Sequence, residues 1–240
     1  MLPLGDAPLP PAGGVGGGPT PSPLRGSSPP ASGKGEIGDR GLVRLYWPAH
    51  LRSAFDALFA LEDVLLGVAR TSTQPALGAI RMAWWRDALR RLDEAPPPGE
   101  PHLQAIAAQL RPRAVGGAEL AAVAEGYATL FDPTPDLNLI GAAGRSLFAA
   151  GARVLGAEDD ALGEAARRYA LARVARLGLI AEAPPPLPPF KHRFARKARP
   201  LTALARLAER DLRALPAVEP EATPARAAAL LAHRFTGAIA

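Results

Sequence analysis

Apolar residues spaced three and four positions apart constrain the fold of this chain more than any other feature. Between residues 49 and 70 these positions are Leu51, Phe55, Leu58, Leu61, Leu65 and Val68. This spacing puts all of them on one face of an α-helix, which has to be buried against neighbouring elements. Nowhere does an alternation of apolar and polar residues of the kind found in half-buried strands stand out. The sequence therefore predicts an all-α protein.

The same periodicity recurs along the chain, and proline, glycine and polar residues separate the helices. A helix that starts at Pro75 and ends before residue 95 is expected to bury Leu77, Ile80, Trp84, Ala88 and Leu92. Further helices are expected over residues 102–110, 118–130, 136–156, 160–181, 201–215 and 224–237. The proline-rich stretch 183–190 cannot be helical, so we expect it to connect two of these helices.

Composition divides the chain into two parts. Residues 1–40 are mostly proline, glycine and serine, and such a segment has too little apolar surface to offset the entropy of ordering, so we expect it to be disordered. Residues 41–240 are long enough for one helical domain with a sizeable core. The chain has no cysteine and no apolar run long enough to span a membrane, which favours a cytoplasmic protein with no transmembrane segment.

Candidate metal ligands are few. Three acidic pairs have spacings of interest, Asp132 with Asp136, Asp160 with Glu164, and Asp56 with Asp63. Prolines interrupt the first pair, the second lies at a helix start where acids favour the helix dipole, and the third is about 10 Å apart. The four histidines, His50, His102, His192 and His233, have no partner at the spacing of metal ligands. We expect structural roles for all of them.

The net charge of +5 equals the five cations of one segment, residues 190–200, which contains no acid. These cations are Lys191, Arg193, Arg196, Lys197 and Arg199. The favoured interpretation is a solvated connector. The second is peripheral contact with an anionic membrane, with Phe190 and Phe194 inserting into it. Nucleic acid is not expected as a partner, because no aromatic stacking platform accompanies the cations.

Two adjacent tryptophans, Trp84 and Trp85, stand out in a chain that has only three. Arg81 lies one turn before Trp85, where its guanidinium can stack on the indole or pair with a buried acid. We expect one indole to fill the core and the other to pack under a neighbouring helix or line a cleft.

The tryptophans belong to a stretch, ALFALEDVLLGVARTSTQPALGAIRMAWWRDAL over residues 57–89, that resembles the squalene/phytoene synthase family in its short alphaproteobacterial-type branch. The matching residues are Pro75, Gly78, Arg81, Met82, Trp84, Trp85, Arg86, Asp87, Ala88 and Leu89. Residues 141–156, 199–212 and 225–237 resemble later segments of the same branch more weakly. The resemblance covers about residues 42–237.

This resemblance implies an isoprenoid-synthase-like helical bundle around a central cavity. Active members of the family join two prenyl diphosphates head to head, and two aspartate clusters hold the magnesium ions and diphosphates. Where the first cluster is expected, this chain has Leu66, Gly67 and Arg70. Where the second is expected, no aspartate occurs between Asp160 and Asp211. We therefore expect a pocket poor in carboxylates, which cannot compensate the charge of two diphosphates and their metals.

Two functions remain open. The favoured one is a catalytically degenerate family member with a binding or assembly role and no metal, by analogy with the family's subgroup of complex I assembly factors. The alternative is an active, magnesium-dependent prenyltransferase of isoprenoid or carotenoid biosynthesis. Whether the protein is an enzyme stays undecided at this point. An isoprenoid or lipid is the expected ligand, and the residues expected to line its cavity are Arg81, Trp84, Trp85, Phe59, Leu66 and Arg145.

Overall fold

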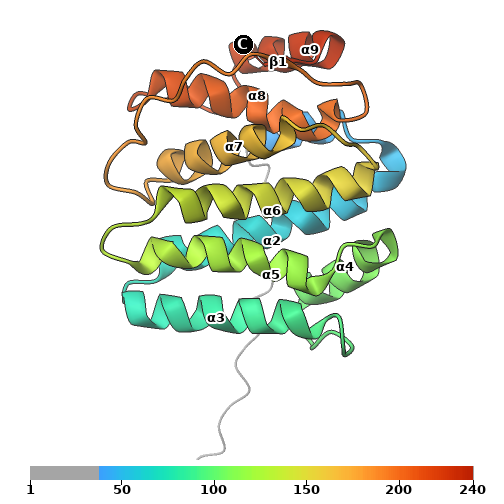
Figure 1. Ribbon diagram of the computed structural model, residues 1–240, viewed down its shortest axis with the longest axis vertical. Helices are drawn as coiled ribbons and strands as arrows, with labels where there is room; N and C mark the ends of the chain where they lie inside the picture. The colour runs from blue at the N-terminus through green and yellow to red at the C-terminus, as the bar shows by residue number, and fades with distance from the viewer. Residues whose placement is uncertain (1–37, 240) are drawn as a thin grey trace, which may run out of the picture. The chain divides into compact units, whose positions relative to one another are not determined.

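The computed structural model describes residues 38–239, and this part of the chain is helical (Figure 1). The helices are α1 (Asp39–Arg44), α2 (Arg52–Thr71), α3 (Pro75–Arg91), α4 (Pro101–Gln109), α5 (Gly117–Ala128), α6 (Leu137–Leu155), α7 (Leu162–Arg176), α8 (Arg199–Ala214) and α9 (Pro224–Thr236). Short 3-10 turns cover Ala49–Leu51, Arg111–Arg113 and Thr129–Phe131. Two-residue strands β1 (His192–Arg193) and β2 (Ala238–Ile239) pair antiparallel. The all-α prediction is confirmed for residues 38–239.

Of residues 1–40, which are predicted to be disordered, residues 1–37 lie outside the described part of the chain. Helix α1, which the periodicity did not predict, already begins at Asp39, before the domain start expected at residue 41. Helix α7 ends at Arg176 and not at residue 181, because Gly178 has a left-handed backbone with φ of +66° that stops the helix.

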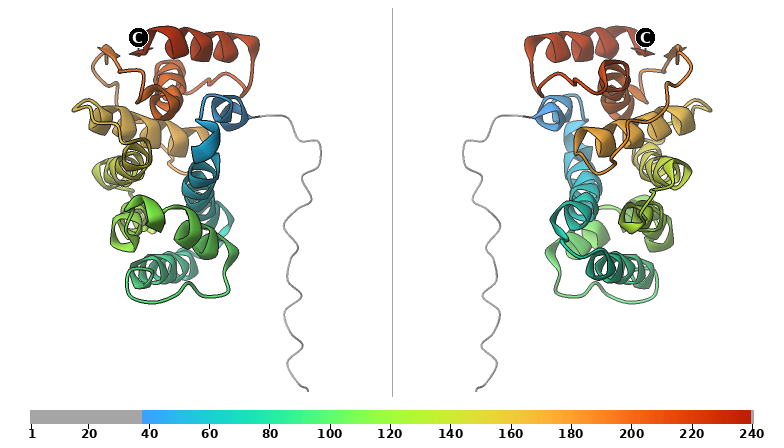
Figure 2. Two further views of the ribbon diagram at one scale, coloured as in Figure 1. Left: turned by 90° about the vertical axis from the view of Figure 1, so that its right-hand side faces the viewer. Right: turned by 90° about the vertical axis from the view of Figure 1, so that its left-hand side faces the viewer.

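Helices α3, α5, α6, α7 and α8 lie side by side in chain order, and α9 covers the α8 end of this row (Figure 1). Helix α2 crosses behind the row, and a turned view separates it from the others (Figure 2). Its apolar face is buried as predicted, with Phe55, Leu58, Leu61 and Leu65 fully inside. Trp47 extends this core by stacking on Phe55, with ring centroids 5.0 Å apart.

Small residues let the helices of the row approach closely. A side-chain carbon added at Gly144 of α6 would lie 2.4 Å from the Ala166 carbonyl oxygen of α7. One added at Gly126 of α5 would lie 2.5 Å from the Leu139 carbonyl oxygen of α6. The alanine- and glycine-rich composition is therefore used for close backbone packing, since few large side chains separate these helices.

Helix α3 has its apolar stripe on the outside, so the prediction that it buries Leu77, Ile80 and Trp84 is wrong. These side chains are 49%, 64% and 44% exposed. Helix α3 is the last of the row and has helices on one side only (Figure 1). That side buries Trp85, together with the predicted core residues Ala88 and Leu92. Periodicity identifies an apolar stripe, but a helix at the edge of the row buries only the face that meets the bundle.

No helix between residues 38 and 239 has both the length and the apolar character that crossing a bilayer requires.

Two glycine substitutions test the close packing of α6 against α7. We expect Gly144→Ala to lower the free energy of unfolding by about 1–3 kcal/mol, because the new methyl group forces the two backbones apart. Gly67→Ala in α2 meets no atom within 4 Å, so it should raise stability by about 0.5–1 kcal/mol through lower backbone entropy. Urea unfolding of both variants measures this. Equal effects of the two substitutions would contradict the α6–α7 packing.

Candidate functional site

The polar groups inside the helical core gather around Glu62 of α2, whose side chain is fully buried. Its carboxylate accepts hydrogen bonds from the Tyr127 hydroxyl at 3.0 Å, the Tyr169 hydroxyl at 2.6 Å and Arg40 Nη2 at 2.7 Å. Burial raises the pKa of Tyr127 and of Tyr169, and the charge of Glu62 raises both further. Both phenols therefore stay protonated and act as hydrogen-bond donors to the Glu62 carboxylate.

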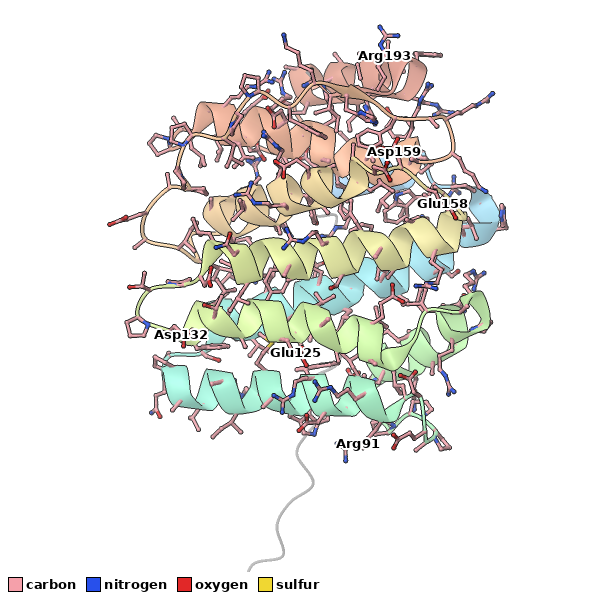
Figure 3. All side chains as sticks on the ribbon, viewed as in Figure 1. Arg91, Glu125, Asp132, Glu158, Asp159 and Arg193 are labelled. Carbon is pink, nitrogen blue, oxygen red and sulfur yellow. The ribbon has the colours of Figure 1, made fainter. Side chains whose placement is uncertain are left out.

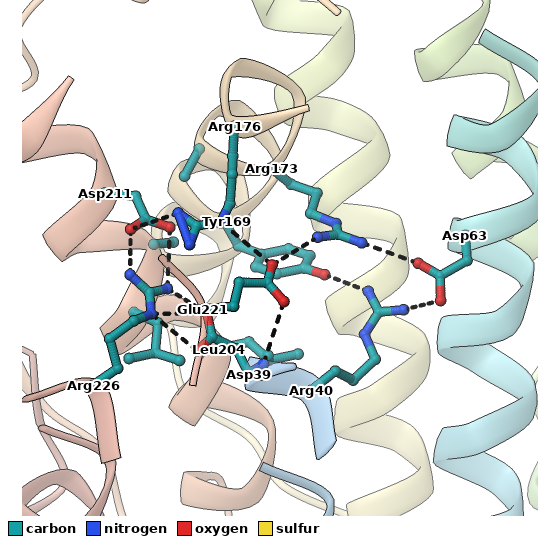
Figure 4. A pocket seen from close by; sticks show the side chains of 13 residues that line it. Asp39, Arg40, Asp63, Tyr169, Arg173, Arg176, Leu204, Asp211, Glu221 and Arg226 are labelled. Atoms are coloured by element: carbon teal, nitrogen blue, oxygen red, sulfur yellow. Dashed lines mark hydrogen bonds and ion pairs between the residues drawn. The ribbon is translucent and has the colours of Figure 1, made fainter. Parts of the chain in front are cut away.

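A second charged centre is built on Arg226 of α9, which is 1% exposed. Its Nε lies 2.9 Å from both carboxylate oxygens of Asp39, and its Nη atoms contact Asp39 and Asp211 (Figure 4). Arg176 adds an ion pair with Asp211 at 3.5 Å. The first helix of the described chain is thereby joined to α7, α8 and α9.

A cavity of about 120 Å³ is lined by Arg40 and Tyr169, which bind Glu62, and by Arg226 of the second centre (Figure 4). Four acids line it, Asp39, Asp63, Asp211 and Glu221, and so do four arginines, Arg40, Arg173, Arg176 and Arg226. The expectation of a pocket poor in carboxylates is wrong for this cavity. Its acids come from helices and turns far apart in the chain, so no aspartate-rich motif in the sequence could reveal them.

Each of these carboxylates has an arginine partner. Asp63 contacts Arg40, and it accepts a hydrogen bond from Arg173 at 3.2 Å. Glu221 lies 3.3 Å from Arg176 and 3.6 Å from Arg173. The four negative charges of the lining are thus balanced by four positive charges that are already bound to them.

Magnesium does not fit this donor set, because the ion prefers several carboxylate oxygens that are free to face it. Among residues 38–239, no group of three or more acidic or histidine side chains is placed to hold a metal ion. The acidic pairs singled out in the sequence have other partners. Asp56 pairs with Arg44 at 2.8 Å, Glu164 with Arg168 at 2.7 Å, and Asp136 caps α6.

The structure does not bring the six expected cavity residues together, and none of them lines the 120 Å³ cavity. Phe59 contacts one lining residue, since the Arg40 guanidinium lies 4.8 Å above its ring. Leu66 and Trp85 are buried in the core, and Arg81, Trp84 and Arg145 are exposed.

A larger groove of about 1040 Å³ lies at the opposite end of the row from α3, between α9, the start of α8 and the turn after α1. Its cations are Arg196, Lys197, Arg199 and Arg234, and no acid from the described residues lines it. Its apolar lining includes Leu231 and Phe235, which are 50% and 73% exposed. Leu45, 66% exposed, is next to the lining residue Tyr46. The groove therefore combines unneutralised positive charge with exposed apolar surface.

The cations of this groove differ in how firmly they are held. Arg199 donates to the carbonyl oxygens of Phe194, Arg234 and Phe235 at 3.0–3.1 Å. Arg234 stacks its guanidinium 4.9 Å above the Tyr46 ring. Arg196 and Lys197 are exposed and form no ion pair with any residue between 38 and 239. These two side chains are available to an anion.

Phe194 is buried, so the expectation that it inserts into a membrane is wrong. Phe190 is half-buried, with the Arg168 guanidinium 5.1 Å above its ring. Arg193 lies in β1, near α9 (Figure 3). The apolar side chains that accompany the basic segment at the surface come instead from α9, which begins at Pro224, 24 residues after the segment ends.

His233 forms the inner wall of the groove. Its Nε2 lies 3.0 Å from the Thr202 hydroxyl, and its Nδ1 lies 3.0 Å from the Ala238 carbonyl oxygen. Burial lowers the pKa of His233, and the positive charges of Arg206 and Arg199 lower it further. A neutral imidazole with Nδ1 protonated donates to Ala238 and accepts from Thr202, which joins α8, α9 and β2.

No family model matches this chain, and no curated protein or solved structure does so either.

Two arginine substitutions test whether the buried contacts of Arg226 hold the ends of the domain together. We expect Arg226→Met to lower the free energy of unfolding by about 3–5 kcal/mol, because it leaves Asp39 and Asp211 buried without a partner. The matched control is Arg44→Met, whose partner Asp56 and own side chain are both more than 40% exposed, so the loss there should be about 0–1 kcal/mol. Thermal and urea unfolding distinguish the two. A loss below about 1 kcal/mol for Arg226→Met would contradict this role.

Proposed function

We propose that this protein is a non-catalytic relative of the squalene/phytoene synthases that binds the surface of an anionic membrane through its basic groove. The single observation that carries the proposal is the contrast between two places in the molecule. The charged cavity has its four carboxylates bound to four arginines, whereas the groove has cations without acids beside exposed apolar side chains.

Charge matching argues against magnesium-dependent prenyl transfer. A metal that entered the charged cavity would have to displace arginines from Asp63, Asp211 or Glu221, and would leave those partly buried guanidiniums without their partners. The volume of about 120 Å³ is also small beside the 300–1,000 Å³ typical of ligand pockets. These properties favour a structural role for the cavity and a binding role for the protein.

The groove has the composition of a peripheral membrane site. Basic side chains near an anionic bilayer contribute about 1 kcal/mol each, and apolar side chains that enter the acyl boundary add to this. Arg196 and Lys197 supply the free charge, and Phe235 and Leu231 supply the apolar surface. The isoprenoid-synthase-like bundle, the cytoplasmic location and the lipid partner expected from the sequence are all part of this proposal.

A turnover assay separates this proposal from the alternative of an active prenyltransferase, which the motif over residues 57–89 favours. The protein is incubated with Mg²⁺ and either farnesyl or geranylgeranyl diphosphate, and released pyrophosphate is measured. We expect no release above a control without protein, because no free carboxylates meet the metal. If the protein releases pyrophosphate and the Asp63→Asn variant does not, the cavity is catalytic and the proposal is overturned.

Vesicle sedimentation tests the membrane site directly. We expect binding to phosphatidylcholine vesicles that contain phosphatidylglycerol, and little binding to pure phosphatidylcholine. Arg196→Gln with Lys197→Gln should weaken binding by at least about tenfold, since two charges contribute about 2 kcal/mol. Phe235→Ser should weaken it similarly, because a phenylalanine side chain contributes about 1.5–3 kcal/mol when buried.

The matched controls for the vesicle experiment lie at the α3 end of the molecule. Arg81→Gln removes one exposed arginine and Ile80→Ser one exposed apolar side chain, and neither should change binding. Equal affinity for neutral and anionic vesicles would overturn the membrane site. So would release of the bound protein by soluble geranylgeranyl diphosphate, which would make a free isoprenoid diphosphate the ligand.

A further inference from the structure

Helix α3 presents an apolar stripe that no described residue covers. Leu77, Ile80 and Trp84 follow each other at helical spacing and are exposed. The apolar stripe from Leu77 to Trp84 is about 10 Å long, and Arg91 lies on the same face two turns further along α3. Single exposed apolar residues are ordinary on protein surfaces, but three large ones in one line mark an interaction surface.

A pocket of about 230 Å³ adjoins the stripe where it reaches Trp84. Its lining is mostly apolar and consists of Trp84, Ala88, Arg91, Leu92, Ala95, Pro96 and Pro98. An indole beside a small apolar pocket is the arrangement that dominates binding energy at protein interfaces, because a partner's side chain can be fully desolvated there.

The stripe is positively charged. Arg81 and Arg91 are exposed and form no ion pair with the part of the chain that the structure describes, and Arg91 points away from the bundle (Figure 3). The only acid within α3, Asp87, is hydrogen-bonded to Arg86 at 2.9 Å. Arg90 is bound to Glu125. A partner of matching charge must therefore bring acids beside the apolar side chains, opposite Arg81 in the middle of α3 and opposite Arg91 at its C-terminal end.

We propose that α3 is a docking site for an amphipathic helix of a partner protein, with leucine-like residues along one face and acids flanking them. A helix that lies along the stripe would use the i, i+3, i+4 and i+7 anchors common to helix recognition. A second copy of this chain is disfavoured as the occupant, because two α3 stripes packed together would bring Arg81 and Arg91 against like charges.

A bilayer is also disfavoured as the occupant. Helices α3 and α9 lie at opposite ends of the long axis of the row (Figure 1), so α3 faces away from a membrane that the groove contacts. This one step rests on the proposed function. The experiments stay separable, because the groove and α3 are tested with different variants and different probes.

The test uses the full chain and three synthetic helical peptides. The first has leucines at helical spacing flanked by glutamates, the second replaces the glutamates with lysines, and the third is a scrambled, non-amphipathic version of the first. Trp84 reports binding, because Trp47 and Trp85 are buried. We expect the acidic peptide to shift the emission to shorter wavelength, with the lysine and scrambled peptides bound at least about tenfold more weakly.

Two variants of the full chain locate the binding. Ile80→Ser should weaken the acidic peptide about tenfold or more, and Phe235→Ser, at the other end, should not. Arg81→Glu with Arg91→Glu should reverse the preference, so that the lysine peptide binds better than the acidic one. Because both α3 substitutions are on the surface, far-UV circular dichroism should show an unchanged fold.

Several outcomes would overturn the docking site. These are no binding of the acidic peptide, equal binding of the acidic and lysine peptides, or unchanged binding by Ile80→Ser. Self-association that Ile80→Ser abolishes would make a second copy the occupant, and a vesicle-induced shift of Trp84 emission would make a bilayer the occupant. If vesicles fail to bind while the acidic peptide binds as described, the membrane proposal fails and the docking site stands.

Discussion

The buried contact of Arg226 with Asp39 and Asp211 is the interaction on which the arrangement of the domain depends. It joins α1 to α8 and α9 across 187 residues of sequence. A buried charge without a partner costs several kcal/mol, so a guanidinium in this position is tolerated only where acids are placed to meet it. The same condition applies to Glu62, which has two phenols and Arg40 as donors. Bundles of this kind are held by apolar burial, but the position of their ends is specified by matched charges.

Charge matching also decides which chemistry is open to the protein. Carboxylates are the natural ligands of magnesium only when their oxygens face an open site. Here Asp63, Asp211 and Glu221 face arginines. Acidic residues therefore line a cavity of this fold without making it a metal site. The reactive capacity of a cavity follows from which charges remain unpaired, and not from how many acids surround it.

Periodicity predicted the helices well, because a helix 15 to 20 residues long repeats its apolar spacing several times. It did not predict which face of α3 is buried, since Leu77, Ile80 and Trp84 form as regular a stripe as the buried residues of α2. The position of a helix at the edge of the row is a tertiary property that local spacing does not contain. The partners of Arg226 were likewise inaccessible, because nothing in the sequence relates Asp39 to a residue of α9. Glu62 did carry a signal, as an acid between Leu61 and Leu65 on an apolar face has to find donors in the core.

The distribution of unpaired cations explains more than the net charge does. The excess of +5 equals the cations of residues 190–200 in number, yet Arg199 of that segment is bound to three carbonyl oxygens and serves the junction of α8 with α9. Within residues 38–239, Arg196 and Lys197 form no ion pair at that end of the domain, and Arg81 and Arg91 form none at the other. Each pair of free cations is accompanied by exposed apolar side chains, Leu231 and Phe235 at one end and Ile80 and Trp84 at the other. Free charge next to apolar surface is costly to maintain in an isolated protein, because it invites non-specific association. The occurrence of this combination at both ends of a bundle whose interior charges are matched is the basis for proposing that each end binds a partner.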